Sequence, residues 1–79
     1  MRLDKYLKVS RLIKRRSVAN DACDNERVTV NGREAKASYQ VKPGDIIEIA
    51  FGSRRLRVEV TAVTENAAKA DAAAMYREI

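Results

Sequence analysis

The sequence has 79 residues, 46% of them hydrophobic and 34% charged, which is enough for one globular domain with a modest core. Its net charge of +5 and pI near 9.7 favour a polyanionic partner, either nucleic acid or an anionic membrane surface. One cysteine and no histidine exclude an internal disulfide and disfavour structural zinc and haem attachment. No stretch approaches about 18 apolar residues, and no signal peptide or lipidation motif is visible, so we expect a cytoplasmic protein without membrane contact.

The excess of positive over negative charge is confined to the first sixteen residues. This run holds seven basic residues and one acid, Asp4, and so carries +6, whereas the remainder holds nine basic and ten acidic residues. A solvated helix face is the competing interpretation, but such a face normally interleaves acids with bases. A charge excess restricted to one segment is typical of a polyanion site. We therefore predict that RNA is bound by the basic side chains of this run: Arg2, Lys5, Lys8, Arg11, Lys14, Arg15 and Arg16.

Helical periodicity predicts a first helix along the same run. At about 100° per residue, one side forms a core-facing stripe made of Leu3, Tyr6, Leu7, Ser10 and Ile13. Asp4, Lys5, Lys8 and Arg11 are expected on the opposite, solvent-facing side. There Asp4 can pair with Lys8, four residues further on.

A second helix is expected from Ser17, whose hydroxyl can cap it, to about Asp24. Its packing positions are Val18, Ala19, Ala22 and Cys23. We interpret Cys23 as a small packed residue and not as a nucleophile. The joint between the two helices carries three cations over 14–16, beside the positive end of the second helix dipole. A phosphate bound there would meet side-chain charge and backbone amides together.

From Arg27 the hydrophobic period changes to two. Strands are expected at Arg27–Val30 and Arg33–Ala35, around Ile47, Ile49 and Phe51, and around Leu56, Val58, Val60 and Ala62, with the valine, isoleucine and phenylalanine positions inward. Asn31-Gly32 predicts a tight hairpin turn, and Lys42-Pro43-Gly44-Asp45 predicts a type II turn. Residues 36–41 read as an irregular crossing segment, and 52–55 as a hairpin loop.

The exit of the second helix has no glycine, although a helix leading directly into a strand usually needs a left-handed residue there. Either Asn25 or Glu26 must take that conformation, glutamate at about 1 kcal/mol of strain. Towards the end of the chain the period returns to helical, through Ala68, Ala72, Met75, Tyr76 and Ile79. The sequence thus predicts an α+β domain over 1–63, with two amino-terminal helices on a small, mostly antiparallel sheet, and a carboxy-terminal helix over 64–79.

This succession resembles the S4 RNA-binding domain. The resemblance covers about residues 1–51 and is carried by Arg2-Leu3-Asp4-Lys5 with Leu7, Arg16-Ser17 with Ala19, Arg27-Val28 with Val30-Asn31-Gly32, and Ser38, Val41 and Lys42-Pro43-Gly44-Asp45. The S4 resemblance implies recognition of RNA backbone and shape. It also places the family's glycine at Glu26, so we expect Glu26 to be the left-handed residue.

Within that superfamily, the chain most resembles the bacterial ribosome quality control P-site factor family of small stand-alone S4 proteins. This resemblance implies binding of an obstructed large ribosomal subunit through its rRNA and the P-site peptidyl-tRNA. A partner elongation factor would meanwhile add an alanine tail to the stalled chain. The family's RNA contacts map best onto Arg2 and Arg16, with Arg11 and Arg15 next. We expect a monomer without cofactor or metal.

Three alternatives stay open. The first is an RNA-binding protein with a different target. It would either rescue large subunits in the heat-shock manner without tailing, or bind free rRNA during assembly. The second is an S4-bearing enzyme such as a pseudouridine synthase, which the lack of room for a catalytic domain and of any catalytic constellation disfavours. The third is a protein-interaction module whose basic face meets an acidic partner.

Overall fold

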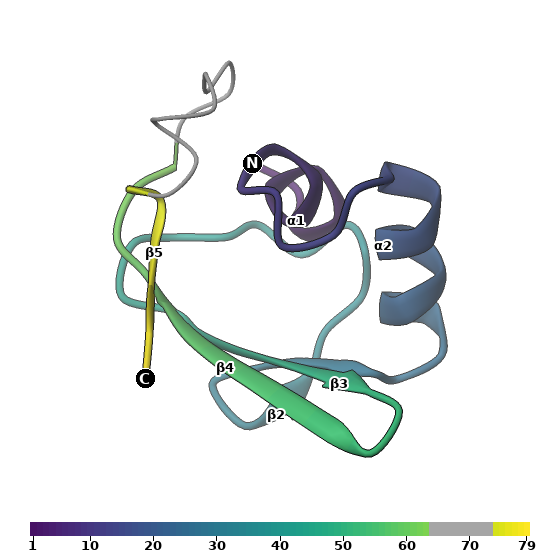
Figure 1. Ribbon diagram of the computed structural model, residues 1–79. Coiled ribbons are helices and arrows are strands. Elements are labelled where there is room, and N and C mark those ends of the chain that lie inside the picture. The colour runs from purple at the N-terminus through teal and green to yellow at the C-terminus, as the bar shows by residue number, and fades with distance from the viewer. Residues whose placement is uncertain (64–73) are drawn as a thin grey trace.

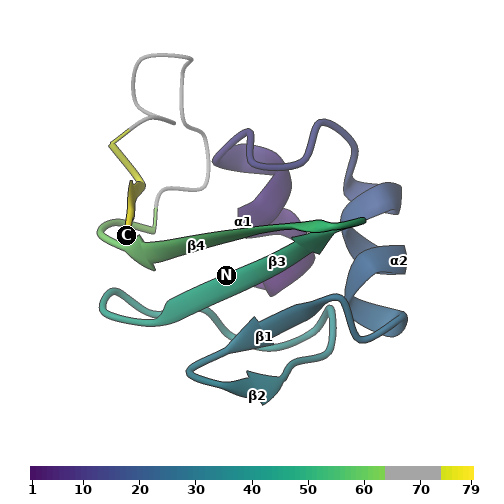
Figure 2. The same ribbon diagram turned by 60° about the horizontal axis from the view of Figure 1, so that its bottom comes forward.

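The computed structural model describes residues 1–63 and 74–79, and in this part of the chain two helices pack against one five-stranded antiparallel sheet (Figure 1). The elements are α1 (Leu3–Val9), α2 (Arg16–Asp24), β1 (Val28–Val30), β2 (Arg33–Glu34), β3 (Ile46–Phe51), β4 (Arg54–Val60) and β5 (Tyr76–Glu78). The strand order is β2-β1-β3-β4-β5. Both helices lie on the same side of the sheet (Figure 2). The predicted α+β class is confirmed.

The core lies between the helices and the inward face of the sheet. Register pairs Val28 with Ile49 and Ile47 with Val58, so the alternating apolar positions of three neighbouring strands face the same way. The valines and isoleucines predicted to face inward are buried, whereas Phe51 is 44% exposed. Leu56 and Ala62, which alternate with the last strand's valines, are partly exposed. Phe51 is exposed because β3 continues past the first residue of β1, and its pairing there is with Arg54 of β4 alone.

The turns follow local backbone chemistry. Asn31 and Gly32 have φ of 54° and 81°, as a tight hairpin of this type requires. The amide of Asp45 donates to the carbonyl of Lys42 at 3.1 Å, with Gly44 at φ 94°, which confirms the predicted type II turn. The loop predicted over 52–55 is shorter, because Arg54 already pairs with Phe51 and begins β4.

The exit of α2 is formed by Glu26, which has φ 61° while Asn25 has φ −94°. The Glu26 amide donates to the carbonyl of Cys23 at 3.2 Å, and the Arg27 amide to that of Ala22 at 2.9 Å. These two bonds form a Schellman motif, which satisfies the last carbonyls of the helix and turns the chain into β1. The prediction that Glu26 is the left-handed residue is confirmed.

The helix predicted over 64–79 is not shown. Residues 64–73 lie outside the described part, and Tyr76–Glu78 form β5, which pairs antiparallel with β4, so the prediction is wrong for these three residues. Two contacts explain the difference. Met75 is fully buried in the core, and its carbonyl accepts a hydrogen bond from the Tyr6 hydroxyl at 2.6 Å. Tertiary pairing of this kind overrides helix propensity. The domain boundary at residue 63 stays a prediction.

Candidate nucleic-acid interface

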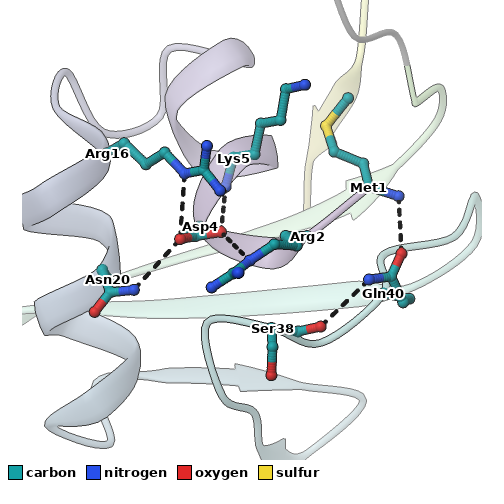
Figure 3. A network of polar contacts seen from close by, with 8 residues as sticks. All are labelled: Met1, Arg2, Asp4, Lys5, Arg16, Asn20, Ser38 and Gln40. Atoms are coloured by element: carbon teal, nitrogen blue, oxygen red, sulfur yellow. Dashed lines mark hydrogen bonds and ion pairs between the residues drawn. The ribbon is translucent and has the colours of Figure 1, made fainter.

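The start of α1 is fixed by the crossing segment, residues 36–41, and not by a capping side chain. The Leu3 amide donates to the Tyr39 carbonyl at 2.8 Å, and the Asp4 amide to the Ala37 carbonyl at 3.2 Å. The amino group of Met1 donates to the side chain of Gln40 at 3.2 Å (Figure 3). These bonds satisfy amides that would otherwise be free at a helix start. They also hold the side chains of the first turn in a fixed place on the body of the domain.

Asp4 lies at the centre of the site and is 2% exposed. Its Oδ1 accepts from Arg2 Nε at 3.2 Å and from the Lys5 amide at 2.8 Å, and its Oδ2 accepts from Arg16 Nε at 3.3 Å and Asn20 Nδ2 at 3.3 Å (Figure 3). The predicted solvent-facing position for Asp4, with Lys8 as partner, is therefore wrong. Asp4 faces α2, which packs across α1, and periodicity within one helix does not reveal that neighbour.

The carboxylate of Asp4 is held in its charged form. Burial by itself raises the pKa of a carboxyl group, but here hydrogen bonds from Asn20, Arg16 and the Lys5 amide, together with the charge of Arg16, outweigh it. The net effect is that the pKa of Asp4 is lowered below its ordinary value of 3.8. Asp4 is therefore a permanent anion at neutral pH, surrounded by donors.

Arg2 and Arg16 are fourteen positions apart in the sequence but meet on this one carboxylate. Their side chains are 47% and 49% exposed, so each is held at its inner end and open at its outer end. Both bind Asp4 through Nε. Within residues 1–63 and 74–79, no partner is found for their terminal guanidinium nitrogens. The two terminal nitrogens of a guanidinium group are donors that bind phosphate oxygens in arginine–phosphate contacts.

The other predicted RNA-binding residues lie on α1 and along the connection to α2. Lys8, on α1, is exposed, and so are three cations along the connection to α2: Arg11, Lys14 and Arg15. Lys5 follows Asp4 and is partly buried. Of the seven predicted residues, the structure brings Arg2 and Arg16 together on one anchor. The RNA-binding role of all seven stays a prediction.

Two expectations about α2 are wrong. The helix begins at Arg16, so Ser17 lies inside its first turn, and no side chain caps the helix. Val18, expected to pack, is 51% exposed. Cys23 is buried, as expected, and burial together with the nearby charges of Asp4 and Asp24 raises the pKa of its thiol to about 11. A thiol with that pKa is not a reactive nucleophile.

Sequence analysis did not identify Asn20 or the anchoring role of Asp4. The signal was present, because Arg16 and Asn20 are four apart on α2 and therefore share a face. What the sequence lacked was the crossing of the two helices, which brings that face to Asp4.

In residues 1–63 and 74–79, no three side chains of the metal-binding types gather into a cluster. None of the helices in those ranges is both long and apolar enough to span a bilayer.

Comparison with known proteins decides the family. The model of the S4 domain matches residues 1–47. The chain belongs to the S4 domain family. It is 50% identical over 76 residues to a protein of Bacillus subtilis named RQC P-site tRNA stabilizing factor, covering 96% of this chain and 88% of that one. It is 52% identical over 79 residues to the Streptococcus pneumoniae protein of the same name, covering all of this chain and 90% of that one.

Solved structures agree with the fold. Heat Shock Protein 15 of Vibrio cholerae, described as trimeric, superposes with a TM-score of 0.92 at 30% identity, over all of this chain and 81% of that one. The solution structure of a protein designated HP1423 superposes with a TM-score of 0.84 at 32% identity, over all of this chain and 96% of that one. The arrangement of the two helices and the small sheet is therefore shared with both of these solved structures.

Proposed function

We propose that this chain is an RNA-binding factor of ribosome-associated quality control. It binds the obstructed large ribosomal subunit through large-subunit rRNA and the P-site peptidyl-tRNA. By holding that tRNA it supports alanine tailing of the stalled chain by a partner elongation factor. It acts as a monomer in the cytoplasm. The proposal is supported by two relatives named RQC P-site tRNA stabilizing factor, to which about half of the residues are identical over nearly the whole chain.

The observation that carries the RNA-binding part is the pair of half-exposed guanidinium groups of Arg2 and Arg16, fixed on the buried carboxylate of Asp4. Arginine groups in that setting suit the RNA backbone. Tyr6, the one aromatic residue of the basic run, is fully buried and bonded to the carbonyl of Met75, so it offers no surface on which a base could stack. Recognition is therefore by phosphate position and RNA shape, without a sequence code.

The same features favour binding over catalysis. Asp4 has a lowered pKa and Cys23 a raised one, whereas a general base or a thiolate nucleophile needs the opposite shift. We therefore propose that the chain acts by holding RNA.

The test is to purify the tagged protein from cells and identify the RNA that comes with it. We expect large-subunit rRNA and tRNA without small-subunit rRNA, and loss of both RNAs from the Arg2→Ala/Arg16→Ala double variant. The matched control is Arg55→Ala, which removes an exposed arginine on the sheet. Recovery of both subunits in equal amount would contradict the proposal. So would an association of the tagged protein with its partners that survives RNase treatment, because RNA would then not be what holds them together.

A second candidate is large-subunit rescue of the heat-shock type without tailing. It is favoured by a Heat shock protein 15 homolog of Aeromonas salmonicida, 33% identical over 78 residues, and by the superposition on the Vibrio protein. The two functions separate in cells that lack this chain and express a stalling reporter. Loss of alanine tails supports the first candidate, whereas normal tails with the same co-purified RNA support the second.

A further inference from the structure

We infer that Asp4 is a positioning residue for RNA binding. It holds Arg2 and Arg16 as one preformed unit that receives backbone phosphates. The inference rests on the proposed RNA-binding function and adds to it a role for an acidic residue that a charge-based assignment would leave out.

The first argument is the choice of atoms. Both arginines contact Asp4 through Nε, one on each carboxylate oxygen. A contact made through Nε leaves the two terminal nitrogens of each guanidinium group for another ligand. Each arginine can therefore bind Asp4 and a phosphate oxygen at the same time, which a lysine, with a single nitrogen at its end, does less well.

The second argument is the rigidity of the anchor. Asp4 is 2% exposed, its own amide is bonded to the Ala37 carbonyl, and its oxygens also accept from Asn20 and the Lys5 amide. Its position is thus set by α1, α2 and the crossing segment together (Figure 3). Arginine side chains tied to such an anchor have lost much of their rotamer freedom before RNA arrives. Ordering them on binding then opposes association less.

The third argument gives the test its direction. An anion at an RNA site repels phosphate, so charge alone predicts that removing it strengthens binding. Positioning predicts the reverse, because two cations lose their fixed place. The sign of the change therefore separates the two accounts.

The experiment uses the full chain and its Asp4→Asn variant, which keeps the shape of the side chain and removes the charge. Binding to purified bacterial large ribosomal subunits is measured across a salt series, with melting curves recorded beside it. We expect about tenfold weaker binding and a salt slope smaller by about one unit, although the variant carries one more net positive charge. Unchanged or tighter binding by a folded Asp4→Asn variant would overturn the inference.

A double-mutant cycle shows whether Asp4 acts through Arg16. If it does, Asp4→Asn adds little once Arg16→Ala is present, whereas full additivity overturns the inference. Should Asp4→Asn fail to fold, Arg16→Lys decides. That variant keeps the charge, and we expect it to bind nearly as weakly as Arg16→Ala, while wild-type affinity overturns the inference.

Failure of the proposed function would look different. In that case the wild-type chain itself would not bind large subunits under any salt condition. Failure of the inference leaves wild-type binding intact and changes only the response to the Asp4 and Arg16 substitutions.

Discussion

The helical half of the molecule and the sheet differ in how they treat charge and backbone strain. In the helical half, the buried carboxylate of Asp4 is paired with two arginines, whereas the buried carboxylate at the entry to β3, Asp45, accepts hydrogen bonds from the uncharged groups of Asn31, Tyr39 and the Lys42 amide. Two charged residues of the helical half, Arg11 and Glu26, have left-handed backbones with φ of 65° and 61°. In the sheet and the turn that enters it, the left-handed positions shown by the structure are occupied by residue types that tolerate them: Asn31, Gly32, Gly44 and Gly52.

The same contrast appears in the ion pairs. On the outer face of the sheet, Glu48 pairs with Arg55 at 3.0 Å and Glu59 pairs with Arg77, each as an exposed cross-strand pair. In the helical half, Asp4 is shared by two arginines and is out of contact with solvent. Exposed pairs contribute little to stability, whereas a buried one fixes the geometry of its partners.

This difference has a functional meaning. Proteins depart from the usual preferences for backbone conformation and charge burial where a functional site requires it, and follow those preferences elsewhere. The departures in this chain gather around α1, α2 and their connection, the same region that holds the predicted RNA-binding cations. The sheet supplies the core that supports this region.

The largest expected effect is on RNA affinity. Arg16→Ala and Arg2→Ala should each weaken binding to large ribosomal subunits by about 2 kcal/mol, because each removes a charge-assisted contact with phosphate. Each should also reduce the salt slope by about one unit. Filter binding or anisotropy across a salt series measures both quantities. Arg55→Ala is the matched control on the sheet and should change neither. Unchanged salt slopes in both the Arg2 and Arg16 variants would show that the RNA site does not lie on α1 and α2.

Sequence reasoning reached most of the fold because the relevant signals are local. The hairpin at Asn31-Gly32, the turn ending at Asp45 and the alternation through Ile47 and Ile49 all depend on neighbours in the chain. The exit at Glu26 was also predicted, with the S4 resemblance deciding between two candidates.

Two of the misses, at Asp4 and at Tyr76, share one cause, which is contact between elements distant in the sequence. Asp4 is buried only because α2 crosses α1, and Tyr76 is in a strand only because the edge of β4 is free to pair with it. No pattern within one segment contains either fact.

The second prediction concerns strain at the exit of α2. Glu26→Gly should stabilise the domain by about 1 kcal/mol, because glycine takes a positive φ without steric cost. Thermal and denaturant unfolding measure the change. Asn31→Gly is the matched control on the sheet. It should be destabilising, since Asn31 Nδ2 donates to Asp45 at 3.1 Å and its Oδ1 accepts from the Ile46 amide at 2.9 Å. A lowered melting temperature for Glu26→Gly would contradict the strain argument.

The third prediction separates strain from function at Arg11. Arg11→Gly should raise stability by somewhat less than 1 kcal/mol, since the relief of strain is partly offset by a looser unfolded chain. The same substitution removes an exposed cation beside the RNA site, so affinity for large subunits should fall. Opposite signs in the unfolding and binding measurements are expected. A gain in both would show that Arg11 does not contact RNA.

The smallest expected effect is at the exposed pair of Glu48 and Arg55. Truncating either to alanine should change the free energy of unfolding by about 0.5 kcal/mol or less, and a double-mutant cycle should give a coupling of about 0.3 kcal/mol. High salt should remove that coupling, because the Arg55 side chain is 76% exposed and well screened. The pair joins adjacent strands that already share a full ladder of backbone bonds, so its loss leaves the register unchanged. A coupling above about 1 kcal/mol would mean that the sheet also depends on specific charge pairs, and the contrast with the Asp4 site would then be one of degree.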